Sequence, residues 1–335
     1  MQDFNSTEDA EEFVGETLEE TLEHVGQRLG FYQELGPDHM AVFAENGGTI
    51  FDDEPTVLLV SFVPARDDDA TLEDVCPLGC HLRKKHGWAH LCVVATAEKW
   101  FRDPAVYAFF DQLVDDAFFE HYDRVIFFGE RMCGYAAAAF SVAAPGAHVL
   151  AFSPQATLNP AVAGWDTRYP RARLLDFTER FGYAPEMAEA ADKVYVIYDP
   201  YERLDAMHAA LFSGNFAMHL PIRFHGADTA EELDTSGVLP ELVEAAAGDR
   251  LDRTLFYRLM RKRRYVRRYL RRVLAETQNR RRPYLTAMAA RTILTYRVGP
   301  QIKEAYTTAL TKLEKEGRTL PDLQPHPASA KAAQG

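Results

Sequence analysis

Apolar and polar positions alternate in a way that predicts strands and helices in regular succession through the middle of the chain. The run at residues 56–63 (TVLLVSFV) is apolar at nearly every position. A strand that is buried on both faces is typical of a parallel sheet covered by helices. The patterns predict strands at residues 39–44, 56–63, 90–95, 124–128, 147–152, 193–198 and 216–224, and helices at 104–119, 134–144, 204–211 and 230–247. This succession predicts an α/β fold with a doubly wound, mostly parallel sheet, whose sites lie at the carboxyl ends of the strands.

The two ends of the chain carry helical patterns only. Residues 8–33 place apolar side chains at helical spacing, which predicts an amphipathic helix. Residues 251–316 predict three helices, broken by Gly, Pro and polar residues near 279–283 and at 299–300. We therefore expect an acidic N-terminal helical segment (1–38), an α/β domain (39–247), a basic helical appendage (248–318) and a disordered tail (319–335).

One turn in the predicted sheet has the pattern of a nucleophile elbow. Residues 125–138 read VIFFGERMCGYAAA, which predicts a buried strand, a tight turn and an Ala-rich helix. In the elbow pattern G-x-S-x-G the nucleophile lies in a strained turn, and the residues two positions away must be small. Gly129 and Cys133 are the two small residues here. This frame places Arg131 at the nucleophile position.

With this frame the chain resembles the α/β-hydrolase superfamily, and in particular bacterial members with the elbow G-x-S-M-G-G-Y-A-A. The resemblance covers about residues 39–247, and it includes AFSPQ (151–155) and YDPYERLDAMH (198–208). The matching elbow residues are Gly129, Met132, Gly134, Tyr135, Ala136 and Ala137. The resemblance implies that Asp199 is the remnant of the triad acid and that His225 is the remnant of the triad histidine. The glycine that usually precedes this histidine is absent.

Some bacterial proteins that are similar to this chain carry the label phosphoadenosine phosphosulfate reductase. That activity implies a loop of the SGGKDS kind and a catalytic cysteine near the C-terminus, and the sequence has neither. It also lacks G-x-G-x-x-G after the first strand and G-x-x-x-x-G-K-[ST] anywhere, so no nucleotide cofactor is predicted.

An arginine at the elbow removes the chemistry of the triad. A guanidinium stays protonated and offers no nucleophile, and loss of the triad nucleophile costs on the order of 10⁶ in turnover. Arg131 could instead bind a small anion. We expect a catalytically degenerate binding or interaction module, which the resemblance links to surface polysaccharide or carbohydrate esters. The alternative is an active, esterase-like hydrolase with a non-standard nucleophile such as Cys133, although bulky Arg131 and Tyr135 would flank that cysteine.

One segment has cysteines and histidines at a spacing that resembles that of a metal site. Cys76, Cys80, His86 and His90 have the spacing C-x3-C-x5-H-x3-H, and His81 and Cys92 lie nearby. The gap between the two pairs is well below the ~12 residues that let a zinc finger form between them. We therefore predict no metal site here and interpret the segment as a polar helix joining two core strands.

Charge is segregated along the chain. Residues 1–60 hold fifteen Asp or Glu and one basic residue, while residues 253–282 hold thirteen Lys or Arg and one acid. A helix predicted at 255–274 combines arginines and tyrosines with an apolar stripe, a pattern that suits nucleic acid, an anionic surface or a partner protein. Alternatively, the acidic and basic ends neutralise each other within the fold or across a homo-oligomer.

The chain has no sequence feature of export. Its first residues lack a basic and apolar signal pattern, and no run of ~18 apolar residues suggests a transmembrane segment. Four cysteines in a chain of this length fit reduced thiols. We expect a cytoplasmic protein.

Overall fold

A computed structural model describes residues 15, 17–45, 55–65, 71–296 and 299–321. Contacts between residues divide the chain into two compact units, residues 1–261 and 262–335, and each is described by itself. Most of the tail predicted at 319–335 and the start of the helix predicted at 8–33 lie outside the described residues. Within them, no helix is both long and apolar enough to cross a lipid bilayer.

The first unit is built on one sheet of eight strands, in the order β1-β2-β4-β3-β5-β6-β7-β8. Strand β2 is antiparallel to β1 and β4, and the other neighbours are parallel. The predicted fold class is therefore confirmed. The strands are β1 (Gly30–Glu34), β2 (His39–Ala44), β3 (Val57–Pro64), β4 (Ala89–Ala95), β5 (Arg124–Glu130), β6 (His148–Phe152), β7 (Lys193–Tyr198) and β8 (Ala217–Pro221).

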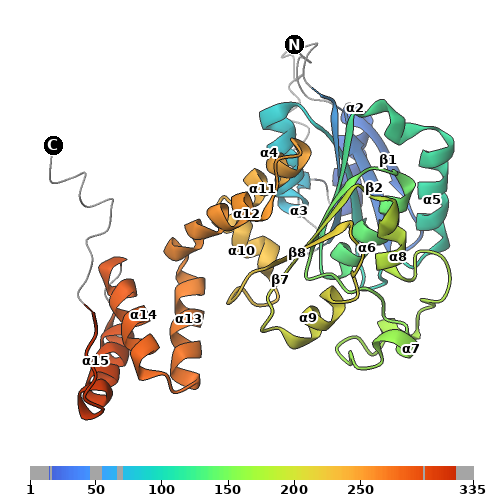
Figure 1. The fold of residues 1–335 in the computed structure, drawn as a ribbon. Helices are drawn as coiled ribbons and strands as arrows, with labels where there is room; N and C mark the ends of the chain where they lie inside the picture. The colour runs from blue at the N-terminus through green and yellow to red at the C-terminus, as the bar shows by residue number, and fades with distance from the viewer. Residues whose placement is uncertain (1–14, 16, 46–54, 66–70, 297–298, 322–335) are drawn as a thin grey trace, which may run out of the picture. The chain divides into compact units, whose positions relative to one another are not determined.

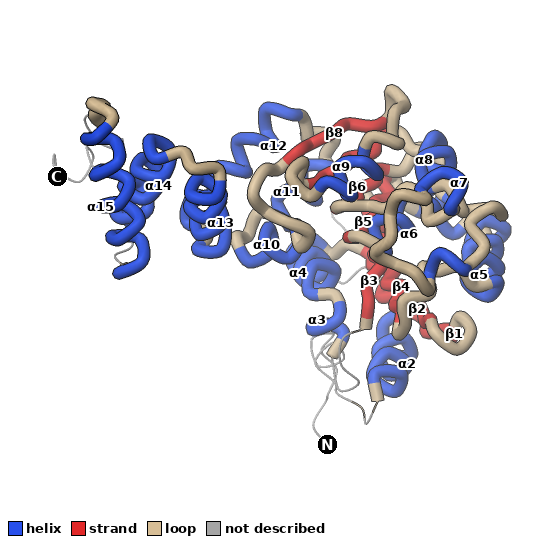
Figure 2. The backbone as a smooth tube through the Cα atoms, turned by 90° about the horizontal axis from the view of Figure 1, so that it is seen from below, coloured by secondary structure: helices blue, strands red, loops and turns tan. Residues whose placement is uncertain are grey.

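Helices cover both faces of this sheet (Figures 1 and 2). One face packs on α5 (Pro104–Asp115), α6 (Met132–Phe140) and the short α8 (Ala184–Met187). The other packs on α4 (Pro77–His86), α10 (Thr229–Thr235), α11 (Leu239–Ala247) and α12 (Arg253–Leu259). Toward β1 and β2, α2 (Leu18–Leu29) and α3 (Leu72–Val75) enclose a third apolar cluster. Further along the chain are the short α7 (Pro160–Ala163) and α9 (Arg203–Ala209).

The helix predicted at 8–33 is wrong at its C-terminal end. Helix α2 ends at Leu29, and the next residues form β1, which pairs with β2. At Gly30 an added Cβ would lie 2.4 Å from the carbonyl oxygen of Phe43, so this backbone approach requires glycine. The apolar residues Phe31 and Tyr32 fit helical spacing, but pairing with β2 determines their conformation.

The helix predicted at 230–247 is also corrected, because it is two helices. Gly237 lies between α10 and α11 with φ of 66°, a conformation that favours glycine and ends the first helix.

The second unit contains α13 (Arg267–Asn279), α14 (Pro283–Tyr296) and α15 (Pro300–Lys315). The last two are helices that the sequence predicts, separated by the break at residues 299–300. The helices meet through two small clusters of apolar residues, which are Leu270, Leu274, Ala290, Ile293 and Ala305, and Ala287, Ala309 and Leu313.

The single basic helix predicted at 255–274 is wrong. It is divided into α12, a 3₁₀ segment (Met260–Tyr265) and α13, and Val266 between them is extended. The 3₁₀ segment contains four consecutive cations, residues 261–264, and like charges one turn apart destabilise an α-helix. Phe256 and Met260 pack in the core of the first unit, so that unit extends past the boundary predicted at 247.

Candidate functional site

Arg131 lies in the sharp turn between β5 and α6. Its backbone has φ of 55° and ψ of −118°, a conformation that costs about 1–3 kcal/mol for a residue with a side chain. Two hydrogen bonds hold it: the Arg131 N–H donates to the Phe152 carbonyl at 2.7 Å, and the Arg131 carbonyl accepts from the Tyr135 N–H at 2.8 Å. The backbone therefore has the strained strand-to-helix turn of a nucleophile elbow.

Two glycines allow this turn. An added Cβ at Gly129 would lie 2.1 Å from the carbonyl oxygen of Cys133, and one at Gly134 would lie 3.0 Å from that of Phe152. The first distance is shorter than any side chain tolerates, because a backbone atom cannot move aside. Residue 129 must therefore be glycine for β5 and α6 to approach, whichever residue occupies position 131.

The side chain of Arg131 is bound to the loop that follows β8. Its Nη2 forms a short ion pair with the Asp228 carboxylate, and its Nε donates to the Ala227 carbonyl at 3.4 Å. Nη1 forms no hydrogen bond within the described part of the chain, and the side chain is 43% exposed. The guanidinium is thus fixed on one side and keeps donors available on the other.

Asp199 and His225 lie in neighbouring loops at the same edge of the sheet. Asp199 follows β7 directly and is buried, as is His225 beyond β8. The carboxylate of Asp199 accepts from the Tyr201 N–H at 2.9 Å and from the Gly226 N–H at 2.8 Å. Asp199 therefore joins its own loop to the loop that carries His225, and Arg131 contacts that second loop two residues further on.

Cys133 does not point into this site. It is 3% exposed within the core beneath α6, and burial raises the pKa of its thiol well above the ordinary range. Because the thiolate is the nucleophilic form, this environment opposes attack by Cys133. The Ser153 hydroxyl, after β6, is also fully buried and has no hydrogen-bond partner among the described residues.

Two acidic residues of the site were not predicted from the sequence. Asp228 pairs with Arg131, and Glu130, the last residue of β5, accepts from the Ala230 N–H at 2.7 Å. Burial raises the pKa of Glu130 to about 7. The only sequence signal for Glu130 is that an acidic residue ends an apolar strand. The sequence gives no signal for Asp228, because its partner Arg131 is 97 residues away.

A buried ionic network supports the segment between β6 and β7. Arg168 donates to Asp166 at 2.8 Å and to Asp205 at 2.6 Å. His208 Nε2 donates to Asp166 at 2.9 Å, while its Nδ1 accepts from the Ala156 N–H at 3.1 Å. Burial opposes ionisation of Asp166, but hydrogen bonds from His208 and Arg168 hold its pKa well below the usual range. The network fixes this segment against α9, which follows the Asp199 loop.

The structure brings some of the residues of the cysteine and histidine motif together and separates others. His86 stacks on Trp88 and pairs with Glu244 at 3.1 Å, away from the others. Cys76, His90 and Cys92 lie together in the core, with ligand atoms all within 4.8 Å of one another. His148, Asp192 and Asp249 form a second, largely exposed group of possible ligands.

The strand order and the strained turn after β5 define the α/β-hydrolase fold. No family model matches the sequence, and no curated protein matches it significantly. Among solved structures, the chain is similar to an S-formylglutathione hydrolase from Agrobacterium tumefaciens (13% identity, 66% of this chain and 94% of that one, TM-score 0.44). It is also similar to Est1E from Butyrivibrio proteoclasticus (13% identity, 65% of this chain and 98% of that one, TM-score 0.39). A third similar structure is the capsule O-acetyltransferase of Neisseria meningitidis serogroup A (7% identity, 63% of this chain and 93% of that one, TM-score 0.38).

The raised pKa of Glu130 predicts a specific pH dependence of stability. Between pH 4.5 and about 7 the folded state binds more protons at this carboxyl than the unfolded state, so stability falls as the pH rises through that window. Glu130→Gln removes this loss, because the amide oxygen can still accept from Ala230. We expect the free energy of unfolding of the variant to rise by on the order of 2 kcal/mol relative to that of wild type between pH 5 and pH 8.

Urea unfolding at both pH values measures this difference, with a variant of an exposed residue, Glu120→Gln, as control. Equal pH dependence in wild type and Glu130→Gln would contradict it.

Proposed function

We propose that this chain is a catalytically degenerate α/β-hydrolase-like protein that binds a small anionic ligand at the elbow. The observation that carries the proposal is the guanidinium of Arg131 at the nucleophile position, fixed by Asp228 and Ala227 with Nη1 available. A planar guanidinium binds carboxylate or phosphate through charge-assisted hydrogen bonds. By resemblance, we propose that the ligand belongs to surface polysaccharide or carbohydrate-ester chemistry.

The contacts of the remnant triad residues support a structural use of the site. Both oxygens of Asp199 accept from main-chain N–H groups, which stabilises the loops around Arg131. Such contacts keep a binding site rigid without a proton relay to a nucleophile. The alternative, an active esterase-like enzyme, requires a nucleophile other than Arg131. The burial of Cys133 disfavours it in that role.

The proposal predicts that the protein does not hydrolyse activated esters. In the presence of wild type or Cys133→Ala, p-nitrophenyl acetate should be hydrolysed no faster than in buffer alone, because neither protein supplies an accessible nucleophile at the elbow. Release of p-nitrophenol followed by absorbance measures this, with heat-unfolded protein as the blank. Enzyme-dependent turnover that disappears in Cys133→Ala would establish the alternative.

Ligand binding should depend on Arg131 and not on Arg124. We expect inorganic phosphate or glucuronic acid to bind wild type and to bind Arg131→Gln at least about tenfold more weakly, the scale of one charge-assisted contact. Arg124→Gln is the matched control, because Arg124 begins β5 and Arg131 follows its other end. Isothermal titration calorimetry measures the affinities. Equal affinity in wild type and Arg131→Gln would refute the assignment.

The second unit supports a separate candidate function, binding to a nucleic-acid backbone. Residues 262–335 hold seventeen Lys or Arg and five Asp or Glu. Leu270 and Leu274 of α13 face the other helices, while Arg264, Arg267, Arg268 and Arg271 are exposed. A groove of about 1590 Å³ within this unit is lined by five basic residues, Arg267, Arg271, Arg281, Arg282 and Lys312, together with Glu304 and Glu316. Clustered arginines of this kind neutralise phosphates.

Substitution of the groove arginines should reduce both affinity and salt dependence. Replacing Arg267, Arg271 and Arg282 with Gln should lower the slope of log affinity against log salt by roughly two to three, since each neutralised phosphate contributes about 0.9. The matched control replaces Lys303, Lys315 and Arg318, exposed basic residues of the same unit that lie outside the groove. Fluorescence anisotropy with labelled RNA and DNA at several salt concentrations, beside a thermal melt, measures this.

Two results would contradict nucleic-acid binding. If the groove variant bound as well as wild type but melted at a lower temperature, the arginines would serve stability and not binding. If acidic vesicles bound and nucleic acids did not, an anionic surface would be the partner.

A further inference from the structure

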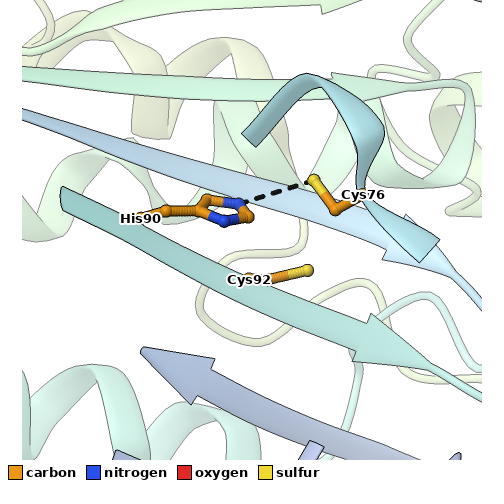
Figure 3. A group of neighbouring side chains, drawn as sticks. All are labelled: Cys76, His90 and Cys92. Atoms are coloured by element: carbon orange, nitrogen blue, oxygen red, sulfur yellow. Dashed lines mark hydrogen bonds between the residues drawn. The ribbon is translucent and has the colours of Figure 1, made fainter. Parts of the chain in front are cut away.

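We infer that Cys76, His90 and Cys92 form a structural zinc site in the core of the first unit. The three side chains come from two separate parts of the fold (Figure 3). Cys76 lies between α3 and α4, while His90 and Cys92 lie two positions apart on β4 and therefore face the same side of the sheet. The site lies apart from the elbow and is independent of the function proposed for it.

The ligand atoms converge at distances suited to a metal ion. The Cys76 sulfur lies 3.4 Å from His90 Nε2, and the ligand atoms of all three residues lie within 4.8 Å of one another. Zinc bound by cysteine and histidine at about 2.3 Å and 2.0–2.1 Å brings tetrahedral ligand atoms to separations of this order. The Ser61 oxygen lies 3.2 Å from the Cys76 sulfur and 2.6 Å from His90 Nε2. This oxygen is a hydrogen-bond partner of both atoms, and it becomes the fourth ligand once a metal ion replaces its hydrogen bond to His90.

The surrounding structure makes room for the imidazole. An added Cβ at Gly79 of α4 would lie 2.1 Å from His90 Cε1, so α4 packs directly over the ring through a residue without a side chain. Ser61 of β3 is the direct neighbour of Cys92 in the sheet. The site therefore joins α4 and the segment before it to the two adjacent strands β3 and β4.

Charge balance favours a divalent ion over other uses of these residues. Binding of Zn²⁺ releases the two thiol protons to solvent, and two thiolates with a neutral imidazole leave the buried site without net charge. A thiol next to an imidazole can also act as a nucleophile. However, Cys76 and His90 are each 2% exposed and Cys92 is fully buried, so no substrate can reach them. A closed site of soft ligands is typical of structural zinc.

The experiment measures metal in the full chain purified without a histidine tag from zinc-supplemented cells. We expect about one zinc per chain by plasma mass spectrometry, and loss to background in Cys76→Ser and Cys92→Ser. Cys133→Ser, which changes a buried cysteine outside the site, should keep its zinc. Replacement by Co²⁺ should give the sulfur-to-cobalt charge-transfer band of tetrahedral thiolate coordination, and this band should be absent from both site variants.

Measurements on wild type keep the inference testable if the site variants fail to fold. X-ray absorption at the zinc edge should show sulfur in the first shell at about 2.3 Å. A shell of oxygen and nitrogen alone would overturn the assignment, as would zinc retained in folded Cys92→Ser. Wild type without zinc or cobalt absorption, or with a Cys76–Cys92 disulfide in the non-reduced mass spectrum, would show a thiol pair and not a metal site.

Discussion

The contact between β5 and α6 is the constraint on which the elbow depends. At Gly129 the two elements approach so closely that no side chain fits, and the residue between them is forced to a positive φ. This geometry positions residue 131 at the carboxyl edge of the sheet, next to the loops after β7 and β8. The backbone therefore has the geometry of a nucleophile elbow, and the side chain at its centre, Arg131, forms an ion pair with Asp228.

Hydrogen bonds around the elbow hold the loops at this edge of the sheet in place. Asp199 bridges two loops through main-chain N–H groups, and Arg131 connects its own turn to the second of these loops through Ala227 and Asp228. Each contact satisfies a polar group at the edge of the sheet. The geometry of the loops is thus maintained by contacts that do not require chemistry at residue 131.

The sequence predicted the features that depend on neighbours along the chain. The limits of β2 and β7 followed from apolar runs, and the turn at Arg131 followed from small residues at fixed spacing. Features that depend on distant partners could not be predicted. Asp228 gives no local signal of its contact with Arg131, and the break between α12 and α13 reflects charge repulsion and core packing that an apolar stripe does not show. Likewise, Cys92 lies near Cys76 because the fold packs the segment between α3 and α4 against β4, whereas the spacing groups Cys76 with Cys80, His86 and His90.

The division into two units coincides with the division of charge. Residues 1–261 hold twenty Lys or Arg and forty-five Asp or Glu, whereas residues 262–335 have a large basic excess. An isoelectric point of 5.3 therefore describes neither unit. In dilute buffer, where the Debye length is ~30 Å at 0.01 M salt, the opposite net charges of the two units are little screened. One copy can adhere to an anion exchanger through one unit and to a cation exchanger through the other, and modest salt releases it from both.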